Sequence, residues 1–142
     1  YTHDLIREHA PDTEVIAVGS SELVQLAEEK LRGKLIHADS LQPILAPFFE
    51  HPNATQMDVL VLACTHFPLL REELTTQFPP HLSLIDSGEA IARRVAYLLE
   101  DHVFIEKIPE HKAVFTKASP AIEALRPQLL PFGIDQLEIL AD

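Results

Sequence analysis

The residues best suited to chemistry lie in one short run, Cys64-Thr65-His66, directly after an apolar stretch. Cys64 is the only cysteine of the chain, and His66 follows two residues later, so a turn would let both side chains face one cavity. A cationic imidazole and the N-terminus of a following helix both stabilise a thiolate, so the pair could serve as a base or nucleophile. The alternatives are a buried structural cysteine and a histidine that caps a helix or lies on the surface.

Carboxylates supply the other candidates. Glu28 lies on an amphipathic stretch, but it is one of 22 acidic residues, and a solvated surface carboxylate is the alternative. Asp86-Ser87-Gly88 follows an apolar run, and Asp86 with Glu89 resembles a capping box, which is a structural role. The eight histidines show no metal-ligand spacing, and no phosphate-binding glycine motif is present. We therefore expect no metal site and no nucleotide cofactor.

Short apolar runs alternate with amphipathic stretches, which predicts an α/β fold with a parallel sheet. The continuous apolar run Asp58–Ala63 is typical of a parallel strand covered on both faces, and it would deliver Cys64 to the carboxyl end, where open α/β sheets bind ligands. The other expected strands are Val15–Val18, Leu82–Ile85, Lys112–Thr116 and Gln136–Leu140. The expected helices are Glu22–Leu31, Leu41–Glu50, Pro68–Phe78, Glu89–Glu100 and Pro120–Leu130.

Local signals set some expected boundaries. Gly33 is a stop signal for the first of these helices. The second would begin after a cap at Asp39 or Ser40, and Pro47 would end or kink it. The charged stretch 100–111, interrupted by Pro109, is a possible boundary between two parts of the chain.

Composition restricts the class of protein. With 142 residues and a net charge of −11, the chain is one domain's length and carries no basic surface for nucleic acid or anionic membranes. No apolar run approaches the roughly 20 residues of a membrane-spanning helix. A single cysteine cannot form an intrachain disulfide, which favours a reducing, cytoplasmic location. The chain lacks an initiator methionine and opens on Asp4–His9, which reads as the tail of a helix, so we expect either a truncated chain or a trimmed complete domain.

Three stretches together resemble the C-terminal half of bacterial glutamate racemases, of the aspartate/glutamate racemase superfamily. The run Leu62–Leu70 is similar to the family's second cysteine motif, Leu-Gly-Cys-Thr-His followed by Tyr or Phe and Pro-Leu-Leu, with Ala63 replacing the glycine. The stretch Ile85–Arg94 is similar to the family's later Asp-Ser-Gly segment, and Val24–Glu28 lies where the family has an aliphatic helix ending in a functional glutamate. The resemblance covers nearly the whole chain and is weaker beyond Leu99.

The resemblance implies cofactor-independent inversion of glutamate by two cysteines, one on each face of a planar carbanion. By this analogy Cys64 is the acid/base on one face, the one that deprotonates L-glutamate. His66 assists its proton transfer and contacts the substrate, and Glu28 orients the imidazole. Thr65 binds the substrate's α-carboxylate or ammonium group. The product would supply D-glutamate for peptidoglycan.

The family builds its site between two α/β domains, and its first domain carries the other cysteine. The resemblance therefore implies a truncated racemase-like fold, with residues 1–86 as the second domain and residues 87–142 returning to complete the first. The expected partners are glutamate, the missing N-terminal half of the same polypeptide and, since the family commonly dimerises, a second copy. Two alternatives stay open: a racemase for aspartate or another amino acid, and a non-catalytic binding or thiol-sensing domain.

Overall fold

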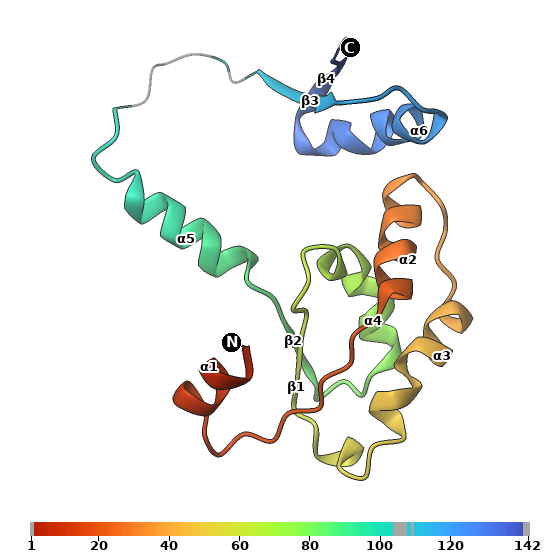
Figure 1. Ribbon diagram of the computed structural model, residues 1–142, viewed down its shortest axis with the longest axis vertical. Helices are drawn as coiled ribbons and strands as arrows, with labels where there is room; N and C mark the ends of the chain where they lie inside the picture. Colours follow the sequence, from red (N-terminus) through yellow and green to blue (C-terminus); the bar gives the residue numbers. More distant parts are fainter. Residues whose placement is uncertain (1, 104–107, 109, 141–142) are drawn as a thin grey trace.

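The computed structural model describes the backbone of residues 2–103, 108 and 110–140, and side chains from residue 4 onward (Figure 1). The helices are α1 (Thr2–His9), α2 (Ser21–Leu31), α3 (Ala38–Phe49), α4 (Arg71–Gln77), α5 (Gly88–Leu98) and α6 (Pro120–Leu129). The strands are β1 (Val59–Val61), β2 (Ser83–Ile85), β3 (His111–Phe115) and β4 (Ile134–Ile139). Short 3-10 turns are η1 (Ala54–Gln56), η2 (Phe67–Leu70) and η3 (Leu130–Phe132). The predicted α/β class is confirmed.

All described strand pairs are parallel, as the sequence predicts. β1 pairs with β2 in the register Val59↔Ser83 to Val61↔Ile85. β3 pairs with β4 in a second sheet, and η3 and α6 accompany that pair. Within the described residues, the chain therefore forms two small parallel sheets rather than one. In Figure 1, the β3–α6–β4 unit lies beyond α2, away from the β1–β2 sheet. Part of the expected boundary at residues 100–111 lies outside the described residues.

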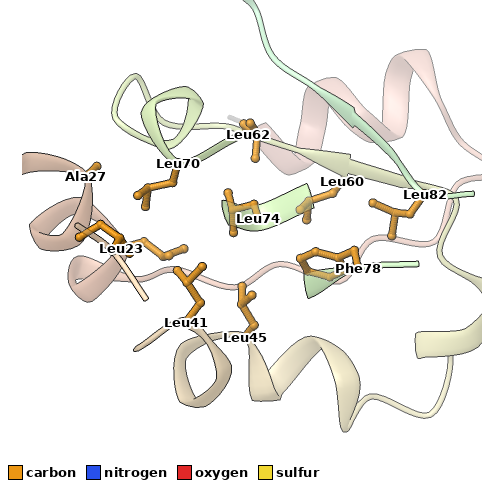
Figure 2. Packing of buried hydrophobic residues seen from close by; sticks show 11 residues of the cluster. Leu23, Ala27, Leu41, Leu45, Leu60, Leu62, Leu70, Leu74, Phe78 and Leu82 are labelled. Carbon is orange, nitrogen blue, oxygen red and sulfur yellow. The ribbon is translucent and has the colours of Figure 1, made fainter. Parts of the chain in front are cut away.

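The apolar core belongs to the first sheet and its helices. Eleven apolar side chains are buried, and Figure 2 shows them packed between α2, α3, α4 and the strands. They are Leu23, Ala27, Ile36, Leu41, Leu45, Leu60, Leu62, Leu70, Leu74, Phe78 and Leu82. All of them lie between Leu23 and Leu82 in the sequence, so this part of the chain contains the buried core of the described residues.

The β1–β2 sheet is covered on one face only. Leu60 and Leu62 point into the core, whereas Val59, Val61 and Ile85 are exposed on the other side. The continuous apolar run around β1 predicts burial on both faces, so that expectation is wrong for the described residues. The physical reason is that the core-forming helices α2, α3 and α4 all pack on the side of Leu60.

Two predicted elements differ from the structure. The segment Val15–Val18 is not a strand, because a strand requires a ladder partner and the described residues offer it none. α3 has His37 as its N-cap instead of Asp39 or Ser40, and it continues through Pro47 to Phe49. Complete burial of Leu41 and near-complete burial of Leu45 stabilise this helix and offset the hydrogen bonds that prolines cannot donate.

Arg71 at the start of α4 fixes the position of the end of β2 through two side-chain contacts. One guanidinium nitrogen donates to the Leu84 carbonyl oxygen at 2.8 Å, and another pairs with the Asp86 carboxylate. The other oxygen of Asp86 accepts the Gly88 backbone N–H at 2.7 Å, where α5 begins. Asp86 therefore acts as a structural turn residue, as predicted. The predicted capping box does not form, because Ser87 rather than Asp86 occupies the N-cap position of α5, and Glu89 pairs with Arg93 instead.

The hydrogen bond from the Gly88 backbone N–H and, second, the hydrogen bond from the Arg71 side chain lower the pKa of the Asp86 carboxyl below its ordinary value. A folded-state pKa that is depressed adds stability above the ordinary value, and this stability is lost as pH falls through the folded pKa. We therefore expect Asp86→Asn to lower the unfolding midpoint at pH 7. The difference from the unchanged chain should shrink at pH 3 and below.

Urea unfolding at pH 7 and pH 3 measures this effect. Glu89→Gln is the control, because it removes one carboxylate from an exposed pair on α5. An Asp86→Asn difference that is as large at the lower pH as at pH 7 would contradict the assignment.

Candidate active site

Cys64 lies at the carboxyl end of β1, where the sequence places it. The pairing with β2 continues past the strand, because the Leu62 N–H donates to the Ile85 carbonyl oxygen at 2.8 Å. The buried side chain of Leu62 anchors the chain just before the turn. Cys64 itself is half-buried, with a free thiol, so it is not a fully buried core residue.

A tight turn then brings His66 back toward the thiol. The Cys64 carbonyl oxygen accepts the Phe67 N–H, and the His66 carbonyl oxygen accepts the Leu69 N–H, both at 3.1 Å. The predicted long helix is therefore η2 followed by α4, with Pro68 in the first turn of η2. His66 occupies the N-cap position but its side chain makes no capping hydrogen bond. The capping alternative for this histidine is wrong.

The imidazole of His66 instead lies between a thiol and a carboxylate. Its Nδ1 is 3.7 Å from Cys64 Sγ, a hydrogen-bonding separation for sulfur. Its Nε2 is 3.5 Å from Glu28 Oε1. The His66 and Glu28 side chains are 36% and 41% exposed, so solvent screens this pair in part. The three residues form a line along which a proton on sulfur can be accepted by nitrogen and the resulting charge stabilised by a carboxylate.

Glu28 reaches this line through the packing of α2. The helix begins at a cap in which Ser20 Oγ accepts the Leu23 N–H at 3.1 Å. Leu23 and Ala27 face the core, and α2 packs directly on η2. Glu28 follows Ala27 on the helix, which places its carboxylate at the edge of that contact and beside His66.

Sequence reasoning missed Arg32. Its guanidinium forms an ion pair with Glu28 Oε2, the carboxylate oxygen that does not face His66. The Arg32 side chain is 35% exposed. The signal that could have found it is the spacing of four residues, since oppositely charged side chains at that spacing meet on a helix surface.

Thr65 is not part of this line. Its side chain is exposed, and among the described residues its hydroxyl makes no hydrogen bond. The structure therefore brings three of the four predicted site residues together, namely Cys64, His66 and Glu28. The substrate-binding role of Thr65 stays a prediction. Across the part of the chain that the structure describes, no group of three or more His, Cys, Asp or Glu side chains could hold a metal ion. No helix in that part is long and apolar enough to cross a bilayer.

The fold and the site define an α/β protein with a polar site at the carboxyl end of a parallel strand, the usual ligand-binding edge of such sheets. Known proteins with similar sequences are glutamate racemases. The chain is 44% identical over 141 residues to a glutamate racemase of Pectobacterium carotovorum, an alignment covering 99% of this chain and 49% of that protein. It is 43% identical to a glutamate racemase of Salmonella paratyphi A, over 99% of this chain and 50% of the other.

Solved structures agree. An Escherichia coli glutamate racemase, in complex with L-glutamate and the activator UDP-MurNAc-ala, superimposes with a TM-score of 0.87 at 42% identity, covering 99% of this chain and 53% of the other. The Bacillus anthracis isoform RacE1 has a TM-score of 0.70 at 18% identity, which shows the fold alone. No protein-family model matches the chain. Over 99% of its length the chain is similar to glutamate racemases, and it spans about half the length of the curated relatives it matches.

Proposed function

We propose that this chain supplies one acid/base side of a cofactor-independent glutamate racemase. The observation that carries the proposal is the line Cys64–His66–Glu28 at the carboxyl end of β1. It occurs in a chain that is similar over 99% of its length to glutamate racemases. L-glutamate, with which the Escherichia coli relative forms a complex, is the proposed substrate.

Each residue has a proposed task. The thiolate of Cys64 removes the α-proton of L-glutamate or, as the thiol, returns one in the reverse direction. His66 accepts and returns the thiol proton, and Glu28 stabilises the imidazolium. Thr65 binds the α-carboxylate or ammonium group of the substrate. The α-proton is very weakly acidic, so catalysis also requires groups that stabilise the carbanion in a cavity closed to water.

The second acid/base cysteine must come from outside this chain, because Cys64 is its only cysteine. We propose that residues 1–86 form the second domain of the racemase and that residues 87–142 complete its first domain. Two observations support this division. The buried core of the described residues lies wholly within the first segment, and β3 and β4 form a separate sheet.

Exposed apolar surface also supports the proposal that another part of the racemase packs against this chain. No residue of α5 is buried, although Ile91, Val95 and Leu98 lie at helical spacing along it. On the β1–β2 sheet, Val61 and Ile85 are exposed on the face opposite the core. Apolar surface of this kind is typical of a face that is covered in the assembled protein.

We expect the 142-residue chain alone to show no exchange of the glutamate α-proton. A hybrid in which this chain replaces the matching half of the Escherichia coli relative should restore exchange and racemisation, because both cysteines are then present. Loss of the α-proton signal in D₂O, followed by NMR, measures exchange for both proteins. Robust exchange by the isolated chain would contradict the two-cysteine proposal.

The same hybrid separates the alternative functions. Faster exchange of aspartate than of glutamate would favour a different amino-acid racemase. An inert hybrid that is folded, together with a reactive Cys64 thiol, would favour a binding or thiol-sensing domain. For the assembled protein we further propose a cytoplasmic role in supplying D-glutamate for peptidoglycan, and assembly as a homodimer.

A further inference from the structure

Arg32 caps the C-terminus of α2, next to the site. Its backbone N–H donates to the carbonyl oxygens of Glu28 and Glu29. These hydrogen bonds at the end of α2 fix the position of the Arg32 backbone. Its side chain then turns back by one helical turn and pairs with Glu28 Oε2. The Glu28 carboxylate is therefore shared: one oxygen meets Arg32 and the other faces His66.

This sharing matters because Glu28 is 41% exposed. A carboxylate that is so accessible has several solvated rotamers, and most of them would leave His66 without its partner. A guanidinium that holds one oxygen removes much of that freedom. We propose that Arg32 is a positioning residue for the Cys64–His66 pair and acts through Glu28, an inference that rests on the proposed function.

The proton transfer that Arg32 assists is simple. The S–H bond of Cys64 breaks and an Nδ1–H bond forms on His66, which leaves a thiolate and an imidazolium. The Nε2–H of the imidazolium then points toward Glu28 Oε1, at 3.5 Å from Nε2. Arg32 carries no proton in this step, since a guanidinium stays protonated, and its task is to hold Oε2.

The neighbouring charges have other partners. On α2, Lys30 pairs with Glu73 of α4 at 2.7 Å, and Glu29 pairs with Lys34 at 2.8 Å. Arg71 of α4 pairs with Asp86. Among the described charged groups of α2, η2 and α4, the Glu28–Arg32 pair is the one whose carboxylate also reaches His66.

The test follows the rate at which iodoacetamide alkylates Cys64 in the full 142-residue chain between pH 5 and 10. Arg32→Met should slow alkylation at pH 7 roughly two- to five-fold, the range that corresponds to an exposed ion pair, and should move the profile to higher pH. Arg32→Lys keeps a cation and should recover part of the rate. Lys34→Met is the matched control, because it removes an equal charge from a pair with Glu29 that does not touch His66. It should leave the profile unchanged.

A double-variant cycle tests whether Arg32 acts through the carboxylate. In a Glu28→Gln background, Arg32→Met should have no further effect, because the group it positions has already been removed. Far-UV circular dichroism checks that each variant is folded, and Arg32→Lys carries the test if Arg32→Met does not fold. An alkylation profile that is identical for the unchanged chain and a folded Arg32 variant overturns the inference, as does an equal Arg32 effect with and without Glu28. Neither result changes the expected α-proton exchange by the hybrid enzyme. The proposed function is therefore tested separately, by that exchange.

Discussion

Replacing Cys64 by alanine in the hybrid racemase should reduce exchange of the L-glutamate α-proton roughly 10²–10⁴-fold, the usual contribution of a positioned acid or base. The physical reason is that one face of the substrate loses its only sulfur, and no other side chain of the Cys64–His66–Glu28 line can take its place. NMR in D₂O measures the exchange rate. Racemisation, followed by optical rotation, should fall in both directions, because each direction uses Cys64 once as base or acid.

The control for this loss is Lys34→Met, which changes an exposed pair away from the site and should leave the rate unchanged. His66→Gln should have a smaller effect than Cys64→Ala, since the imidazole acts through the sulfur. If Cys64→Ala keeps the rate of the unchanged hybrid, Cys64 is a structural residue and the proposed function is wrong.

The second large effect is on folding. Leu74 on α4 is only 1% exposed and lies in the cluster with Leu60 and Leu70 (Figure 2). Leu74→Ala should lower the free energy of unfolding by about 2–5 kcal/mol, because it loses buried apolar surface and leaves a cavity. This is a large share of the roughly 5–15 kcal/mol that holds a typical domain together.

Urea unfolding followed by circular dichroism measures this loss. Leu35→Ala is the matched control, because the Leu35 side chain is 73% exposed. Its effect should stay within about 0.5 kcal/mol. Equal losses for the two variants would show that the cluster around Leu74 does not form the stabilising core.

Helices with local signals could be predicted closely. Gly33 predicts the end of α2, and in the structure the helix ends at Leu31 and Gly33 has a left-handed conformation. Proline at the start of α6 and serine before it predict that helix equally well. These signals act over a few residues, so they operate whatever the rest of the chain does.

Elements that depend on distant partners could not be predicted in the same way. The apolar segment Val15–Val18 has strand propensity, yet a strand exists only where a neighbour completes its ladder. Pro47 weakens a helix locally, yet α3 continues because Leu41 and Leu45 are held in the core. In both cases tertiary contacts, which a local pattern does not contain, decide the outcome.

The sequence by itself determined the Cys64–His66 pair. Both residues lie in one turn after a strand, so their proximity follows from a spacing of two residues. Only the tertiary structure decided that Glu28 joins them, because its carboxylate reaches His66 through the packing of α2 on η2. Once Glu28 is placed there, helix geometry brings Arg32 to its second oxygen. Local spacing thus determines that Cys64 and His66 lie close together. The packing of the apolar face of α2 on η2 brings Glu28, and with it Arg32, next to them.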